Sequence, residues 1–323
     1  QALTRSHSAL MSVRNKADEL FRLPARAEEL RGQITFLMES RDADSVYWIE
    51  RRGRRLEHVF LQATPINVAG LLRQTLFEKL DTAVLTSATL AVSGGFGYVR
   101  QRLGLEQAHE LVVPAHFDYS SQALLFVPPE LPDPRAEAFP AHAAQVMRRI
   151  LEASRGRAFC LFTSYAQMKE LHARLLQDLG FPLLVQGSAP RSALLEQFRN
   201  TPHAVLFATA SFWQGVDVQG EQLSCVIVDR LPFAVPNDPV VSARIRALDE
   251  AGQNAFLDYQ VPAAVITLKQ GFGRLIRSLH DRGVLALLDN RILKKQYGSV
   301  FFDSLPAYRR TTRIEDVEAF FGM

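Results

Sequence analysis

Cysteine is scarce in this sequence, and long apolar runs are missing from it. The 323 residues include two cysteines, Cys160 and Cys225, each inside a strand-like apolar stretch. A zinc site or an iron–sulfur cluster usually needs four ligands, so we expect two core thiols and no metal site in this chain. No apolar run approaches the ~18 residues of a membrane span. The first residues, Gln1–Thr4, lack a basic-then-apolar signal pattern, so we expect a cytoplasmic protein without a membrane partner.

A phosphate-binding loop is also absent from the sequence. No Gly-Lys dipeptide occurs, which excludes a Gly-x-x-x-x-Gly-Lys-Ser/Thr motif. The remaining composition is that of an ordinary globular protein, with 47% hydrophobic and 22% charged residues. The length suggests about two domains. The net charge of +3 is compatible with a nucleic-acid partner but does not require one.

The first 60 residues differ in pattern from the rest. Residues 1–40 are rich in Arg, Glu, Leu and Ala and predict helices, with a break or a new start at Pro24. Two strand-like segments, residues 45–50 and 56–61, then flank a turn with a central glycine, which predicts a β-hairpin. The basic tip at residues 51–55 is either a solvated turn or a phosphate contact, and we favour the solvated turn.

From residue 63 onward, short apolar segments alternate with helical ones. Strands are predicted at residues 82–86, 123–127, 158–162, 183–185, 204–208, 224–228 and 284–288. Helices are predicted at residues 67–80, 138–153, 165–179, 192–200 and 262–278. This alternation predicts an α/β fold, a parallel sheet with helices on both faces, with a domain boundary in or just before residues 127–134. Functional loops are then expected at the carboxyl ends of strands, where unusual polar segments do occur.

The strongest local signal is Gln270-Gly-Phe-Gly-Arg-Leu-Ile-Arg277. In a helix, Gln270, Arg274 and Arg277 share one face. Gly271 and Gly273 remove side-chain bulk beside them, at a cost of roughly 1 kcal/mol each. Two guanidinium groups and an amide on one surface suit a polyphosphate, because arginine donates in a fixed fork and stays charged. The alternative is a solvent-facing helix with two salt-bridged arginines, and this segment alone does not decide between them.

Four segments together resemble the motifs of superfamily 2 helicases. Residues 270–277 are similar to motif VI, 86–89 to motif III, 162–165 to motif IV and 210–217 to motif V, in the family's order. Three segments resemble the sequences of the bacterial DinG/YoaA helicases, relatives of XPD. They are Ser-Phe-Trp-x-Gly-Val-Asp, Asp-Arg-Leu-Pro-Phe and Leu-Lys-Gln-Gly-x-Gly-Arg-Leu-Ile-Arg. The resemblance covers residue 60 to the end. It implies a second RecA-like motor domain at 120–323, the C-terminal part of the first motor domain at 61–119, and the end of a helical arch insertion at 1–60.

The resemblance also implies roles for the matched residues. Binding or sensing of the ATP phosphates is implied for Arg274, Arg277 and Gln270. Nucleotide contact, or coupling of nucleotide state to movement, is implied for Asp217, Gly215, Gly273, Ser87 and Thr89. Contact with single-stranded DNA is implied for Ser164, Tyr165, Ser211 and Phe212. For Trp213 we favour packing in the core over stacking on a base, and Gln214 stands where relatives usually carry Glu.

Two parts of the helicase machinery have no counterpart in this sequence. The phosphate loop is missing, and no Asp-Glu-Ala-His precedes residues 86–89; Asp249-Glu-Ala-Gly252 follows motif V and is typical of a surface helix end. We therefore expect the C-terminal part of a longer helicase, inactive alone, whose upstream half binds ATP and Mg²⁺. Any iron–sulfur cluster is expected upstream.

The resemblance implies 5′ to 3′ translocation on single-stranded DNA, unwinding of forked duplex DNA, and a part in DNA repair. Two alternatives remain open. One is a non-enzymatic module that uses a RecA-like fold to bind nucleic acid or protein, and the other is an RNA helicase of the same superfamily.

Overall fold

The computed structural model describes residues 2–12, 22–53, 55–114, 116–209, 212 and 220–322. These residues form two compact units. The first combines Gln1–Leu71 with Val235–Gln253, and the second combines Leu72–Ala234 with Asn254–Met323. Among the described residues, no helix is both long and apolar enough to cross a membrane.

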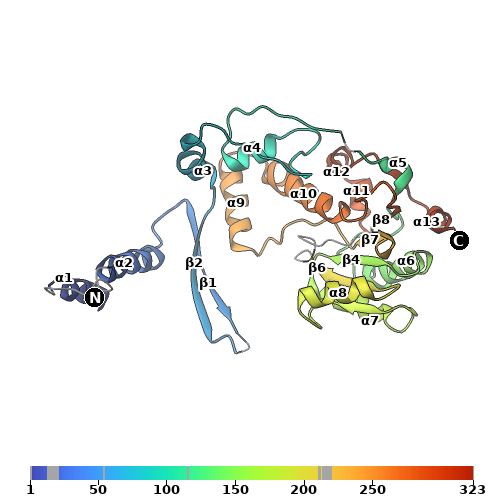
Figure 1. Ribbon diagram of the computed structural model, residues 1–323, viewed down its shortest axis with the longest axis horizontal. Helices are drawn as coiled ribbons and strands as arrows, with labels where there is room; N and C mark the ends of the chain where they lie inside the picture. Colours follow the sequence, from blue (N-terminus) through green and yellow to red (C-terminus); the bar gives the residue numbers. More distant parts are fainter. Residues whose placement is uncertain are drawn as a thin grey trace. The chain divides into compact units, whose positions relative to one another are not determined.

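The first unit contains three helices and a hairpin. Its elements are α1 (Ala2–Ser12), α2 (Leu23–Glu39), β1 (Ser45–Arg52), β2 (His58–Pro65) and α9 (Pro239–Glu250). Pro24 lies in the first turn of α2, where a missing N–H costs nothing. The strands β1 and β2 pair antiparallel from Ser45 opposite Pro65, which confirms the predicted hairpin (Figure 1). Asp249 is exposed near the end of α9, as expected, and the Arg244 Nε donates to the Ile66 carbonyl at 2.8 Å.

The segment that follows the hairpin corrects one prediction. Residues 67–80 are helical in part, as α3 (Ala69–Thr75) and a 3-10 turn (Phe77–Lys79), and α4 covers Gly97–Leu103. The predicted strand at 82–86 is wrong, because this stretch has no regular structure and the Val84 side chain is 85% exposed. A strand needs a neighbour for its backbone groups, and within the described residues none pairs with this segment.

The second unit is built on a seven-stranded parallel sheet in the order β5-β6-β4-β7-β8-β3-β9. Figure 1 labels four of its neighbouring strands, β6, β4, β7 and β8. Its strands are β3 (Ala123–Phe126), β4 (Ala158–Phe162), β5 (Leu183–Val185), β6 (Val205–Thr209), β7 (Cys225–Val228), β8 (Gly283–Leu287) and β9 (Arg309–Thr311). The strands β3 to β8 confirm the six predicted strands, and each end lies within one residue of its predicted position. The strand β9 was not predicted, because Arg-Arg-Thr carries no apolar signal.

Helices cover both faces of this sheet. One face packs against α6 (Phe139–Ala153), α7 (Tyr165–Leu175) and α13 (Ile314–Phe321). The other packs against α8 (Arg191–Asn200), α10 (Val261–Phe272), α11 (Arg291–Lys294) and α12 (Gly298–Ser304). The short α5 (Tyr119–Gln122) leads into β3, and a π-helical turn (Phe256–Gln260) leads into α10. Cys160 and Cys225 are fully buried in the first of these layers, and the predicted α/β fold is confirmed.

The turn between α6 and β4 depends on Gly156. Its φ is +69°, and a Cβ built there would lie 2.0 Å from the carbonyl oxygen of His203. We expect Gly156→Ala to destabilise the protein by about 1–3 kcal/mol, because it combines a disfavoured backbone conformation with a backbone clash. Thermal unfolding should show a melting temperature lower by several degrees. Gly180→Ala is the control, since nothing lies within 4 Å of its added Cβ; equal effects of the two changes would contradict this account.

Candidate nucleotide and nucleic-acid site

The predicted arginines lie beyond the end of α10, not on it. The helix ends at Phe272, where the Gly273 N–H bonds back to the Lys269 carbonyl at 2.8 Å. Gln270 is in the last helical turn, whereas Arg274 and Arg277 occupy the turns that lead to β8. The expectation of one helical face for all three is therefore corrected. Two nearby glycines end the helix, and the chain then bends toward the start of β8.

A carboxylate fixes the turn that carries the arginines. The Asp281 Oδ2 accepts from the backbone N–H groups of Arg277 and Ser278, both at 2.8 Å. The Gln122 side chain donates to the carbonyl oxygens of Ser278 and Asp281 at 3.0 and 2.9 Å. Since Gln122 directly precedes β3, this turn is held at the amino-terminal edge of the sheet.

Arg274 and Arg277 are half-buried, and burial lowers the pKa of each guanidinium. The charge of Arg191 lowers the pKa of Arg274 further, whereas the Asp281 carboxylate raises that of Arg277. Arg191, at the start of α8, was not identified from the sequence. Its proximity to Arg274 means that two like charges share one region, and an anion placed there would relieve their repulsion.

Phe212 lies in the core instead of on the surface. It is 4% exposed, and the Arg191 guanidinium lies 5.4 Å from the centre of its ring. The DNA contact implied for Phe212 therefore lacks an accessible ring face. Ser211, Gly215 and Asp217 lie outside the described residues, as do Trp213 and Gln214, so their implied roles stay predictions.

The loop after β4 carries two of the predicted DNA contacts. The Ser164 Oγ accepts from the Gln167 N–H at 3.2 Å and begins α7 as its N-cap. Tyr165 is the first residue of that helix, and its side chain is 51% exposed at the carboxyl edge of the sheet. Next to it lies Gln186, a residue that no sequence pattern indicated. The Gln186 Nε2 donates to the Tyr165 hydroxyl at 2.5 Å.

Two buried carboxylates support the same edge of the sheet. The Asp229 Oδ1, at the end of β7, accepts from the Thr163 N–H at 3.0 Å. The Asp289 Oδ2, after β8, accepts from the Leu231 N–H at 2.8 Å and pairs with Arg291 at 2.6 Å. Each carboxylate thus holds a loop that follows a neighbouring strand. The sequence signal was a lone Asp directly after an apolar strand.

Ser87 and Thr89 lie in a loop that the rest of the unit holds in place. The Thr89 N–H donates to the Ser87 Oγ at 3.1 Å. Just beyond, the Lys269 Nζ donates to the Ala91 carbonyl at 2.9 Å, and the Ser304 Oγ accepts from the Ser93 N–H at 2.8 Å. Lys269 immediately precedes Gln270, so this contact joins the loop of Ser87 and Thr89 to the helix that carries Gln270.

Arg274 and Arg277 lie between α10 and β8, and the charge of Arg191 acts on Arg274. Guanidinium groups donate to phosphate oxygens in a fixed fork, so this region suits an anionic ligand such as a polyphosphate. The described residues include no group of three or more His, Cys, Asp or Glu side chains able to hold a metal.

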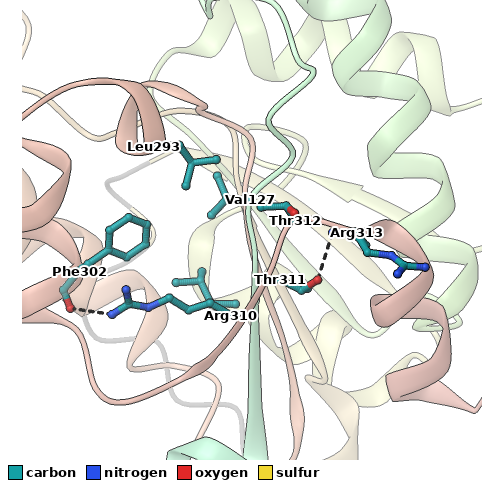
Figure 2. Close-up of a pocket in the computed structure, with 8 residues that line it drawn as sticks. Val127, Leu293, Phe302, Arg310, Thr311, Thr312 and Arg313 are labelled. Carbon is teal, nitrogen blue, oxygen red and sulfur yellow. Dashed lines mark hydrogen bonds between the residues drawn. The ribbon is translucent and has the colours of Figure 1, made fainter.

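A separate hollow of about 300 Å³ lies beside β9 (Figure 2). It is lined by Leu125, Val127, Leu293, Phe302, Arg310, Thr311, Thr312 and Arg313. The Arg310 guanidinium lies over the Phe302 ring at 4.3 Å and donates to the Phe302 carbonyl at 3.4 Å. None of the predicted site residues lines this hollow.

Burial raises the pKa of Asp229 to about 7, against the opposing effect of Arg230, whose Nε lies 3.2 Å from the Asp229 Oδ2. A folded-state pKa above the unfolded value of 3.8 means that the native state binds the proton more tightly. The free energy of unfolding should therefore fall as pH rises from about 4 to about 7, by on the order of a few kcal/mol.

The substitution Asp229→Asn should remove this contribution. Urea unfolding at pH 5 and pH 7.5 would measure it, and the variant should gain stability relative to the unsubstituted protein at the higher pH. Asp303→Asn, at an exposed carboxylate, is the control. A difference between Asp229→Asn and the unsubstituted protein that is the same at both pH values would contradict the assignment.

Comparison with known proteins identifies the family of this chain. Residues 147–308 match the family model described as Helicase C-terminal domain. The ATP-dependent DNA helicase YoaA of Escherichia coli is 42% identical over 289 residues, which are 90% of this chain and 45% of that protein. The ATP-dependent helicase DinG of Mycobacterium tuberculosis is 36% identical over 283 residues, 86% of this chain and 42% of that protein.

A solved structure titled XPD_Helicase shares the fold, with a TM-score of 0.64 at 15% identity, over 93% of this chain and 57% of that one. The chain spans less than half the length of the two helicases compared above. The RecA-like sheet, the ordered motifs and the match over residues 147–308 lead to one conclusion: this chain belongs to the Helicase C-terminal domain family.

Proposed function

We propose that this chain is the C-terminal motor half of an ATP-dependent DNA helicase. The whole protein would couple ATP hydrolysis to 5′ to 3′ translocation on single-stranded DNA and would unwind forked duplexes in DNA repair in the cytoplasm. The observation that carries the proposal is the position of Arg274 and Arg277. Both are half-buried in a turn fixed by Asp281, with Arg191 close to Arg274.

The arginines have a defined task in this proposal. The phosphate loop and the Mg²⁺ ligands would come from the upstream half of the same polypeptide, and ATP with its metal supplies the transferable phosphoryl group. Arg274 and Arg277 would donate to the phosphate oxygens and stabilise the negative charge that develops during transfer. Gln270 and Gly273 would contact or sense the nucleotide. Because burial already removes the arginines from water, less solvent has to be displaced when the phosphates arrive.

The remaining implied residues divide between DNA contact and coupling. Ser164, Tyr165 and Ser211 are proposed to contact the single strand. Ser87, Thr89, Gly215 and Asp217 are proposed to link nucleotide state to movement. The Lys269–Ala91 hydrogen bond supports a link for Ser87 and Thr89, since it joins their loop to α10.

We also propose that residues 61–119 complete a first motor domain, with residues 1–60 as the end of an arch insertion and 120–323 as the second motor domain. Two apolar segments support this. Val84 and Leu85 are exposed, and so are Leu111, Val112 and Val113. Apolar runs of this kind are typical of buried strands. They form no strand in this chain, and upstream sequence would supply the neighbouring strands.

The first test is the ATPase activity stimulated by single-stranded DNA. The protein encoded by the complete reading frame should hydrolyse ATP, whereas the 323-residue chain should not. Arg274→Ala in the longer protein should lower kcat at least ~10³-fold, because an arginine at the γ-phosphate is worth 10³–10⁵. Arg149→Ala is a matched control, since this surface arginine pairs only with Glu315 and Glu318 in the ion pairs described. If the longer protein has no ATPase activity, or if Arg274→Ala does not change kcat, the helicase proposal fails. The non-enzymatic binding module then replaces it.

The second test concerns residues 80–86 and 110–114. In the 323-residue chain their amides should exchange hydrogen rapidly, because they lack strand partners there. In the longer protein exchange should slow by orders of magnitude, as for core strands. Hydrogen–deuterium exchange with mass spectrometry measures both, and β4 serves as a segment protected in each. Equal exchange in the two proteins would refute the proposed first-domain assignment.

A further inference from the structure

One amide side chain joins the ends of three neighbouring strands. Gln186 follows β5, and its backbone N–H donates to the Phe207 carbonyl of β6 at 2.8 Å. Its Oε1 accepts from the backbone N–H and the Oγ1 of Thr209, at 2.7 and 3.0 Å. Its Nε2 donates to the hydroxyl of Tyr165, in the loop after β4, at 2.5 Å. The strands β5, β6 and β4 are adjacent, so their carboxyl ends converge on this amide.

These bonds determine where the Tyr165 ring points. Its backbone is fixed as the first residue of α7, behind the Ser164 cap, and its hydroxyl is fixed by Gln186. A tyrosine side chain with both ends held has little rotational freedom left, although half of its surface faces solvent. An aromatic ring that is exposed and already ordered is suited to stacking on a flat partner, because the entropic cost of ordering it is paid before binding.

The orientation of the Gln186 amide is set from its other side. Because Oε1 faces two donors of Thr209, the amide nitrogen must face Tyr165. The Gln186 side chain is thus held by hydrogen bonds at both its oxygen and its nitrogen. On the same helix as Tyr165, Gln167 accepts from the Arg230 Nη2 at 2.8 Å, which joins α7 to the loop after β7. An exposed and ordered ring on a helix held in this way fits a single strand of nucleic acid, whose bases can stack on it.

We infer that Gln186 is a positioning residue that holds the Tyr165 ring for stacking on a base of single-stranded DNA. This inference rests on the proposed function and adds a residue that no motif singled out. Loss of the amide should weaken DNA binding without removing the ring. Loss of the ring should weaken binding more.

The test uses the protein encoded by the complete reading frame, with a short oligothymidylate that contains one 2-aminopurine. Gln186→Met and Tyr165→Phe should each raise the Kd for this strand by about three- to tenfold, the effect expected for ordering one side chain. The double variant should bind no more weakly than either single one, because both changes break the same bond. Tyr165→Ala should raise Kd by about tenfold or more. Gln177→Met, at an exposed glutamine, is the control.

Two further readouts separate positioning from a general structural role. The quenching of 2-aminopurine on binding should decrease in Gln186→Met, because the base no longer meets an ordered ring. The DNA concentration for half-maximal ATPase should rise, with kcat at saturating DNA nearly unchanged.

Three outcomes would overturn the inference. If Tyr165→Ala leaves Kd unchanged, the stacking role is refuted, whereas the arginine-dependent ATPase still stands. If Tyr165→Ala weakens binding but Gln186→Met does not, or if the two effects add, Gln186 has no positioning role. If the unsubstituted protein neither binds the strand nor responds to it, the proposed function and this inference fail together.

Discussion

A parallel sheet covered by helices on both faces has room for polar groups only where its strands begin and end. In the second unit the inner strands are wholly buried, and their side chains alternate between two apolar layers. An unpaired polar group within those layers would cost several kcal/mol. The polar residues around Tyr165 and those of the arginine-bearing turn consequently lie just after or just before strands of the sheet. The loops there are held in place by Asp229 and Asp289 at one edge and by Asp281 at the other.

The two edges carry different chemistry. The amino edge has the arginine-bearing turn tied to Gln122, whereas the carboxyl edge has hydroxyl and amide groups around Tyr165 and Gln186. Arg191, which lies near Arg274, begins α8 shortly after Gln186 and the end of β5. It therefore lies between the arginine-bearing turn and the residues around Tyr165 in the folded unit.

Sequence periodicity was sufficient for the buried strands but not for features that depend on distant contacts. Continuous apolar runs identified β3 through β8, because full burial requires such runs. The same reasoning extended α10 too far: Leu275 and Ile276 continue the apolar pattern, yet they enter the core from a turn after Gly273. Residues 82–86 have the composition of a strand, but no described strand pairs with them, so the predicted strand does not form. Gln186 was not predicted, because its role depends on hydrogen bonds to Thr209 and Tyr165. These residues are distant in sequence and come together only in the folded sheet.

The position of β3 in the sheet also sets the order in which the protein can be assembled during synthesis. This strand is made first, but its two neighbours are β8 and β9, with Leu124 opposite Val284 and Arg309. Pairings this remote form slowly, since a long loop must close before they contribute. The apolar residues of β3 stay without their partners until residues 283–311 have left the ribosome. During that interval the exposed strand is open to non-native association.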